Sequence, residues 1–224
     1  MDIKTPVIML NVKAYAESTG EKGLQLARAC QEVTEETGVS TAVCPQQVDL
    51  SWIARQIDIP VLAQHVDAFS PGSCTGWTVL DAVKASGAVG TLVNHSEHRL
   101  IIADIEAVVD RAKELDLVTV VCTNNIKVSS AAAALRPTMI AIEPPELIGS
   151  GIPVSKANPE IVEESVRAVK EVSKDVTILC GAGISKGEDV RAAIELGTEG
   201  VLLASGVVKA KDPKEVLLDL ASGV

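Results

Sequence analysis

Aromatic side chains are scarce in this sequence, which has four among its 224 residues: Tyr15, Trp52, Phe69 and Trp77. Their scarcity argues against the aromatic platforms on which single-stranded nucleic acids stack. Basic side chains are outnumbered too, since 20 lysines and arginines stand against 30 acidic residues and leave a formal net charge of −10. This balance argues against a broad basic face that neutralises phosphates, so we expect no nucleic-acid partner.

Long uncharged hydrophobic runs are missing as well. No stretch approaches the roughly 18 apolar residues of a membrane span. The run Val7–Leu10 near the start is too short for the core of a signal peptide. The five cysteines are widely spread with no C-x-x-C pair, a pattern typical of reduced thiols in a hydrophobic core. We therefore expect a cytoplasmic protein with no membrane partner.

Aliphatic residues are abundant, and they fall into two alternating patterns. Hydrophobic residues make up 47% of the chain. Short, nearly continuous apolar runs, typical of parallel strands covered on both faces, alternate with amphipathic segments of helical length. The eight runs are Val7–Lys13, Thr41–Cys44, Val61–His65, Gly90–Asn94, Val118–Thr123, Met139–Glu143, Thr177–Gly181 and Gly200–Ala204.

The number and spacing of these runs predict the fold. Eight repeats in 224 residues give about 28 residues for each repeat, which is close to a minimal β–α unit. This favours a (β/α)8 barrel, a parallel eight-stranded TIM barrel formed by residues 1–224 as a single domain. An open doubly wound sheet is the alternative. It is weakened because Asn11–Ala14, after the first run, lacks the glycine-rich fingerprint of dinucleotide binding.

Helix boundaries carry signals of their own. Gly38, Gly87 and Gly197 follow helical patterns at positions where a left-handed glycine ends a helix. Ser185 and Glu188 have the spacing of a capping box. We therefore expect Ser185 to cap the helix that follows the seventh run.

Polar side chains stand at the carboxyl ends of the runs, where the chemistry of such a barrel takes place. The first run ends in Asn11-Val12-Lys13, and Asn11 and Lys13, two residues apart, point the same way. His95 follows the fourth run, and Glu143 stands after Met139–Ile142 and before two prolines that stiffen the backbone. Each has a simpler interpretation when taken alone, because a lysine after a strand is usually solvated and a single histidine is usually structural.

Glycine-bearing loops follow the seventh and eighth runs, at Cys180–Gly183 and Ala204–Gly206. Either could be no more than a turn. Two such loops in adjacent units, each leading into a helix, also form the usual phosphate cradle of these barrels. With Glu143 as a base, His95 as an electrophile and Lys13 as a cation, the combination favours proton abstraction beside a carbonyl in a small phosphorylated substrate.

Four motifs occur in a fixed order along the chain. They are Asn11-x-Lys13, Asn94-His95-Ser96-Glu97-His98-Arg99, Ala141-Ile142-Glu143-Pro144 with Ile148-Gly149-Ser150-Gly151, and Gly200-Val201-Leu202-Leu203-Ala204-Ser205-Gly206. With them the sequence resembles the triosephosphate isomerase family over its whole length, and most closely the short archaeal form. The resemblance implies an aldose–ketose isomerase of glycolysis and gluconeogenesis that interconverts dihydroxyacetone phosphate and D-glyceraldehyde 3-phosphate. It implies no cofactor and no metal.

The resemblance also implies a role for each site residue, following the division of labour in triosephosphate isomerase itself. Glu143 would move the proton through an enediolate, while His95, kept neutral by a helix N-terminus, would polarise the carbonyl. Lys13 would stabilise the developing charge, Asn11 would orient the substrate, and Glu97 would hold Lys13 in an ion pair. Main-chain N–H groups would bind the phosphate near Ile148, Gly149, Gly183, Ala204 and Ser205.

A lid and an assembly also follow from the resemblance. The residues after Glu143 match the family's lid, whose closure excludes water. The segment Pro71–Trp77 matches the third loop, from which the residue at Thr75 enters the neighbouring subunit; an ordinary turn-rich loop is the alternative. A mean hydropathy of +0.28 favours buried interfaces. We expect a homodimer at least, and resemblance to the short form implies a tetramer.

The sequence departs from the family's pattern at three places. Glu146 stands in the lid where an aromatic is usual, so the hinge chemistry differs. His98 stands where arginine is more common, and Cys122–Asn125 replaces a Cys-x-Gly-Glu motif. Two other functions stay open. Another phosphate-binding barrel isomerase or epimerase would need a different acid–base arrangement, and a catalytically silent oligomeric scaffold would tolerate alanine at His95 and Glu143.

Overall fold

A computed structural model of the chain describes residues 3–144 and 158–224. Outside these ranges lie Glu146 in the lid, the expected phosphate ligands Ile148 and Gly149, and Ser150 and Gly151 of the same motif. Among the described residues, none of the helices is long and apolar enough to cross a membrane.

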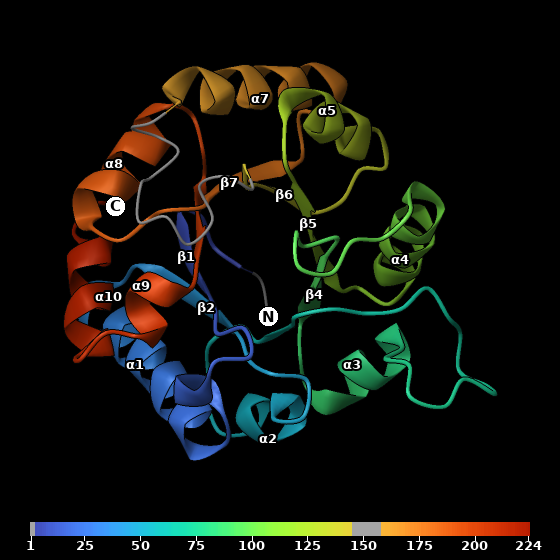
Figure 1. The fold of residues 1–224 in the computed structure, drawn as a ribbon, viewed down its shortest axis with the longest axis horizontal. Coiled ribbons are helices and arrows are strands. Elements are labelled where there is room, and N and C mark those ends of the chain that lie inside the picture. Colours follow the sequence, from blue (N-terminus) through green and yellow to red (C-terminus); the bar gives the residue numbers. More distant parts are fainter. Residues whose placement is uncertain (1–2, 145–157) are drawn as a thin grey trace.

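Eight parallel strands form the centre of the molecule, one in each of the eight apolar runs. Along the sheet the order is β2-β1-β8-β7-β6-β5-β4-β3, and a bridge between Val43 and Val61 joins its two ends. The result is a nearly closed barrel, seen end-on in Figure 1, which confirms the predicted fold class over the open sheet. The strands are β1 (Val7–Asn11), β2 (Ser40–Cys44), β3 (Leu62–Ala63), β4 (Gly90–Val93), β5 (Val118–Thr123), β6 (Met139–Ile142), β7 (Thr177–Gly181) and β8 (Gly200–Leu203).

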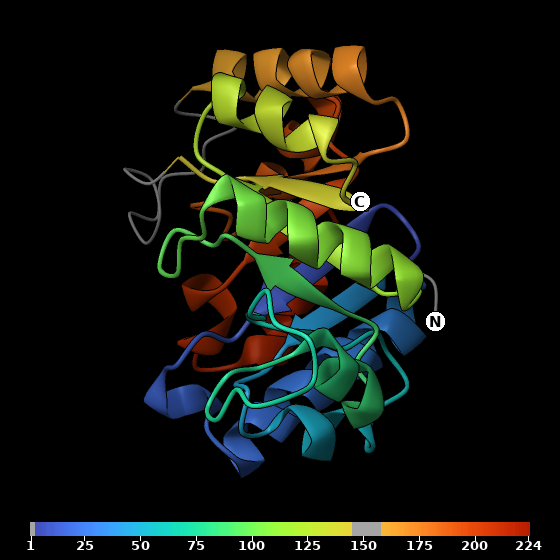
Figure 2. The ribbon, with the colours of Figure 1, turned by 90° about the vertical axis from the view of Figure 1, so that its right-hand side faces the viewer.

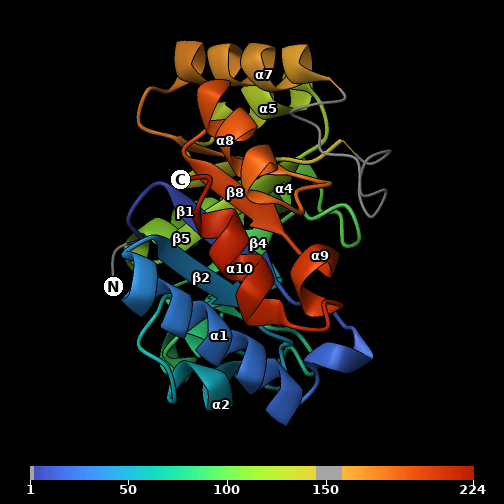
Figure 3. The same ribbon diagram turned by 90° about the vertical axis from the view of Figure 1, so that its left-hand side faces the viewer.

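Helices surround this barrel on the outside. Figures 1 and 2 show α5 and α7 side by side, and Figure 3 shows α1 beside α10. The helices of the described ranges are α1 (Glu21–Thr37), α2 (Leu50–Ala54), α3 (Leu80–Ser86), α4 (Ile102–Glu114), α5 (Ile126–Ala134), α7 (Pro159–Val172), α8 (Gly187–Glu195), α9 (Ser205–Val208) and α10 (Pro213–Ala221), with a short 3-10 helix, η1 (Ala16–Ser18).

The two faces of each strand pack into different cores, which explains why the runs are continuously apolar. Along β1, Ile8 and Leu10 belong to the layer between barrel and helices, whereas Val7 and Met9 point into the barrel. Aliphatic and sulfur-containing side chains fill the interior, as the shortage of aromatics requires. The interior cluster consists of Val7, Met9, Ala42, Cys44, Leu62, Leu92, Val120, Cys122, Met139, Ala141, Leu179 and Leu202.

Strand ends differ from the prediction where the polar residues begin. β1, β4 and β6 stop short, so that Lys13, Asn94 and Glu143 lie just beyond their strands. The third run, predicted as a strand over Val61–His65, is a strand only over Leu62–Ala63. The reason is local: the main-chain N–H of Gln64 donates to the side chain of Gln47, at 3.1 Å, instead of to a neighbouring strand.

The glycines predicted to end helices are confirmed, but the predicted capping box at Ser185 and Glu188 is wrong. Gly38 and Gly87 have φ of +76° and +94° and cap the ends of α1 and α3, and Gly197 after α8 has φ of +94°. At the start of α8, however, the capping carboxylate belongs to Asp189. Its Oδ2 accepts from the main-chain N–H groups of Ser185 and Lys186 at 3.1 and 3.0 Å. The helix begins one residue later than predicted because Asp189 is buried there, while Glu188 is exposed.

Candidate active site

A cavity of about 260 Å³ lies at the carboxyl ends of the strands. Its walls come from the segments after β1, β4, β6, β7 and β8, so residues far apart in sequence meet there. The cavity gathers eight of the predicted site residues that lie in the described ranges: Asn11, Lys13, His95, Glu97, Glu143, Gly183, Ala204 and Ser205. Predicted from different motifs, these residues surround one cavity at the barrel mouth.

Glu143 follows β6 and is almost wholly buried, at 6% exposure. Its main-chain N–H donates to the Thr123 carbonyl at 2.7 Å, which continues the pairing between β6 and β5 beyond the last strand residue. Its Oε2 is buried and has no hydrogen-bond partner among the described residues. A carboxylate oxygen left in this state is available to a ligand in the cavity.

The neighbours of Glu143 keep its carboxylate ionised. Burial by itself raises the pKa of this carboxyl, but the adjacent His95, the Cys122 thiol and the Lys13 ammonium act in the opposite direction and outweigh it, so the pKa lies below its usual value. Burial and the nearby carboxylate raise the pKa of Cys122 well above its usual value, so this thiol stays protonated. Glu143 can therefore accept a proton at neutral pH.

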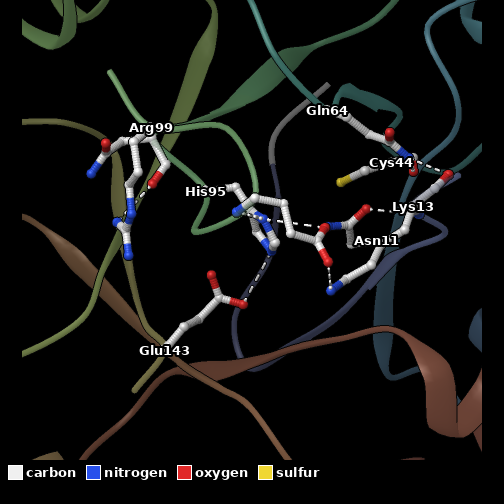
Figure 4. Close-up of polar contacts among 9 residues, drawn as sticks. Asn11, Lys13, Cys44, Gln64, His95, Arg99 and Glu143 are labelled. Atoms are coloured by element: carbon white, nitrogen blue, oxygen red, sulfur yellow. Dashed lines mark hydrogen bonds and ion pairs between the residues drawn. The ribbon is translucent and has the colours of Figure 1, made fainter. Parts of the chain in front are cut away.

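His95 faces Glu143 across the cavity (Figure 4), with 3.6 Å between Nε2 and the carboxylate Oε1. This separation is too long for a hydrogen bond, so both atoms can turn to a ligand. On the other side of the ring, Nδ1 accepts from the main-chain N–H of Glu97 at 3.2 Å. A nitrogen that accepts a hydrogen bond carries no proton, so this contact favours the tautomer with the ring proton on Nε2.

The group that faces Nδ1 belongs to a tight turn and not to the expected helix N-terminus. The N–H of His98 donates to the His95 carbonyl at 2.8 Å, which closes the turn, whereas α4 begins only at Ile102. A single main-chain N–H therefore supplies the contact that the sequence argument assigned to a helix dipole.

Lys13 is held in a strained conformation by side chains on both sides of it. Its φ of +51° lies in the left-handed region, which is unfavourable for lysine. Its N–H donates to Asn11 Oδ1 at 3.0 Å, and Gln64 Nε2 donates to its carbonyl at 3.1 Å and to that of Cys44 at 3.0 Å. Its ammonium lies 2.8 Å from Glu97 Oε1, the ion pair that was predicted (Figure 4).

Gln64 is a site residue that the sequence argument missed. It lies after β3 and touches Lys13 from 51 residues away. An amide side chain after a strand end is a weak signal, and nothing local indicates that its partners are the carbonyls of Lys13 and Cys44. The contact depends on closure of the barrel between β2 and β3.

The loops after β7 and β8 form the remaining wall. Ala182 and Gly183 both have positive φ, +72° and +74°, and α9 begins at Ser205 with Ala204 as its capping residue. An alanine in this conformation is strained, which is typical of loops shaped for a ligand. Ala182, Gly183, Ala204, Ser205 and Gly206 all line the cavity.

Thr75, the last predicted site residue, does not line this cavity. It is exposed in the loop between β3 and α3, which Asp67 fastens by accepting from the Thr78 N–H at 2.7 Å.

A second hollow of about 520 Å³ adjoins the first beyond Lys13 and Glu97, and His65, Trp77 and His98 are among its lining residues. The His65 and His98 rings stack there, with their centroids 3.6 Å apart. The described residues contain no group of histidine, cysteine and acidic side chains arranged to hold a metal ion.

Comparison with known proteins gives one consistent match. The family model described as "Triosephosphate isomerase" matches residues 6–223. The triosephosphate isomerase of Methanocaldococcus jannaschii is 59% identical over 214 residues, covering 96% of this chain and 98% of the relative. That of Methanothermobacter thermautotrophicus is 56% identical over 220 residues, covering 98% and 96%. The crystal structure of triosephosphate isomerase from Bartonella henselae superposes with a TM-score of 0.75 at 20% identity, covering 95% of this chain and 97% of that one.

Proposed function

The chain belongs to the triosephosphate isomerase family, and from this premise we propose how its residues interconvert dihydroxyacetone phosphate and D-glyceraldehyde 3-phosphate. Membership makes the protein an isomerase with a role in glycolysis. One observation carries the mechanistic proposal: a buried carboxylate and an imidazole face each other in a cavity, at a distance that leaves both free to contact a ligand.

Glu143 is the base in this proposal. Its carboxylate removes a proton from the hydroxyl-bearing carbon beside the carbonyl, and the electron pair of the broken C–H bond forms the double bond of an enediolate. The same carboxyl group then returns a proton to the other carbon. His95 gives its Nε2 proton to the former carbonyl oxygen and takes the hydroxyl proton from the other oxygen, which completes the exchange between ketose and aldose. The unpartnered, buried Oε2 supports this role because no hydrogen bond among the described residues has to break before it accepts the proton.

His95 is the electrophile. With its proton on Nε2, the ring donates a hydrogen bond to the carbonyl oxygen, which makes the adjacent C–H bond more acidic and stabilises the enediolate oxygen. The contact from the Glu97 N–H to Nδ1 supports this role, because it holds the tautomer whose Nε2–H points toward Glu143.

Lys13 supplies local positive charge in a protein of net charge −10. Its side chain is only 11% exposed, so its ammonium acts in a partly dehydrated cavity, where charge interactions are stronger than in water. Glu97 fixes the position of the ammonium, and Asn11, which accepts the Lys13 N–H, orients the substrate from the same side of the cavity.

The substrate phosphate binds in this proposal to main-chain N–H groups of the loops after β7 and β8, at Gly183, Ala204 and Ser205. Their place on the wall of the cavity and the positive φ of Gly183 support the assignment. The other two expected ligands, Ile148 and Gly149, lie outside the described residues.

The protein acts as a homodimer at least, and as a tetramer through a second interface. Phe69 and Trp77 support the first contact: their rings lie 4.8 Å apart on the loop that carries Thr75, and they are 48% and 54% exposed. Ile101 and Ile102, at the start of α4, are 68% and 60% exposed and support the second. Measurement of mass in solution tests both, and a monomer would contradict them.

We also propose a cytoplasmic location. The buried thiols of Cys30, Cys44, Cys122 and Cys180 support it.

A coupled assay on glyceraldehyde 3-phosphate, with wild type beside Glu143→Gln, tests the proposed mechanism. We expect an active wild type and a loss of about 10²–10⁴-fold in kcat in the variant, the usual contribution of a positioned acid–base group. Glu106→Gln, which removes an exposed carboxylate from α4, is the matched control and keeps wild-type kcat. A folded wild type without isomerase activity would favour the epimerase or the scaffold. A Glu143→Gln variant with wild-type kcat would contradict the base.

A further inference from the structure

Asn94 stands between β4 and His95 and has no part in the chemistry described so far. It is buried, at 6% exposure, yet it does not line the cavity that holds the catalytic side chains. Its φ of +60° lies in the left-handed region, which asparagine tolerates better than most residues. The backbone therefore reverses direction at this residue, immediately before the electrophile.

The polar groups of Asn94 make three hydrogen bonds to other parts of the chain. Its side-chain Nδ2 donates to the Cys122 carbonyl on β5, at 3.0 Å. Its Oδ1 accepts from the Leu100 N–H at 3.0 Å, and its main-chain carbonyl accepts from Arg99 Nη1, also at 3.0 Å. One bond fixes the residue to the neighbouring strand, and the other two close the loop 95–99 at its far end.

This closed loop carries the contact that determines which nitrogen of His95 is protonated. The Glu97 N–H reaches Nδ1 only while the turn after His95 keeps its shape. If the loop relaxed, Nδ1 could carry the proton instead, and Nε2 would face the substrate oxygen as an acceptor, unable to polarise it.

The bond to Cys122 ties the same loop to the base. Cys122 lies inside the barrel on β5, and it is one of the groups that lower the pKa of Glu143. The next residue, Thr123, accepts the main-chain N–H of Glu143 at 2.7 Å. Asn94 thus connects the backbone that bears the electrophile with the strand end that positions the base.

We propose that Asn94 is a positioning residue that holds the His95 proton on Nε2 and fixes His95 relative to Glu143. The inference rests on the proposed roles of these two residues as electrophile and base. It identifies a determinant of the reaction that lies behind the catalytic side chains and touches no substrate.

Asn94→Gly is the most direct test, because glycine keeps the left-handed backbone and removes both side-chain bonds. We expect a folded protein whose kcat falls by about 10- to 100-fold, as small misplacements of catalytic groups cause, while KM changes little. The ¹⁵N spectrum of His95 should change from one tautomer, with Nδ1 unprotonated, to a mixture. Asn94→Asp, which keeps the acceptor for Leu100 but lacks the donor for Cys122, should lie between Asn94→Gly and wild type.

Asn125→Gly is the matched control, since this asparagine also binds main chain, accepting from the Val128 N–H at 2.9 Å at the start of α5. It should leave kcat and the His95 spectrum unchanged. Wild-type kcat with an unchanged tautomer in Asn94→Gly would overturn the proposal, and so would a loss of activity that only matches a loss of folded protein. Absence of isomerase activity in wild type would instead refute the proposed function, and the spectra would still test Asn94.

Discussion

At the scale of single residues, the site depends on how much space surrounds Glu143. The carboxylate lies against Gly181, the last residue of β7, and a Cβ built on that glycine would overlap Glu143 Cγ. The glycine is needed here for close approach and not for its own backbone conformation. The position of the base is therefore determined by the neighbouring strand β7 as well as by β6.

Gly181→Ala should displace the base while leaving the barrel intact. We expect kcat to fall by about 10- to 100-fold because the carboxylate moves away from the substrate carbon, with a cost of about 1–3 kcal/mol in stability from overpacking. Steady-state kinetics and urea denaturation measure the two effects. Full activity in this variant would mean that Glu143 can work from another position and that Gly181 does not define the site.

Only some site residues could be predicted from sequence. The predictable ones are placed by the end of their own strand, whereas the others depend on contacts with distant parts of the chain. His95 and Glu143 directly follow apolar runs, so the barrel rule places them without knowledge of any contact. Gln64 and Asn94 act through carbonyls 51 and 28 residues away, at Lys13 and Cys122. Such contacts exist only after the strands have paired, and no local pattern records them.

At the scale of elements, burial determines which apolar runs form strands and which acidic residue caps α8. The apolar runs became strands because both of their faces are covered, one by the helices and one by the barrel interior. Two adjacent acidic residues, Glu188 and Asp189, stand near the start of α8. The spacing rule predicts Glu188 as the capping residue, but the buried Asp189 caps the helix. A spacing rule cannot make this distinction, since it contains no information about which side of the helix packs against the protein.

Asp189→Ala tests this cap and its link to the phosphate loop. Loss of the bonds to the Ser185 and Lys186 N–H groups should cost about 0.5–2 kcal/mol, the usual value of an N-cap. Because Ser185 lines the cavity, KM for glyceraldehyde 3-phosphate should rise as well. Denaturant titration and kinetics measure both effects. If Glu188→Ala were the more costly substitution, the spacing rule would have been the better guide.

At the scale of the whole molecule, the net charge is negative, whereas the charge that Lys13 brings to the site is positive. A protein of net charge −10 that binds an anionic substrate needs a small region of opposite potential, and Lys13 with the main-chain N–H groups of two loops supplies it. The second hollow has a different character, since the stacked His65 and His98 adjoin the loop that carries the exposed aromatics. Protonation of His98 should affect the stability of the fold.

Stability should fall on mild acidification, in part through His98. Burial and the neighbouring His65 lower the pKa of His98, while Asp67 opposes them. A histidine with a lowered pKa in the fold stabilises it fully above its unfolded pKa of about 6.5, and this contribution is lost as pH falls toward the folded pKa. His98→Gln should therefore lose less Tm than wild type between pH 7.5 and pH 5. Equal losses would exclude a contribution from His98.

Hydrogen exchange during turnover tests the central claim most directly. If Glu143 carries the proton between the two carbons through an enediolate, its carboxyl proton can exchange with solvent before it is returned. We therefore expect dihydroxyacetone phosphate formed from glyceraldehyde 3-phosphate in D₂O to carry deuterium on carbon, as seen by ¹H NMR, with the rate of formation strongly reduced in Glu143→Gln. A product that retains all of its original hydrogen would indicate a direct hydride shift and would contradict the account.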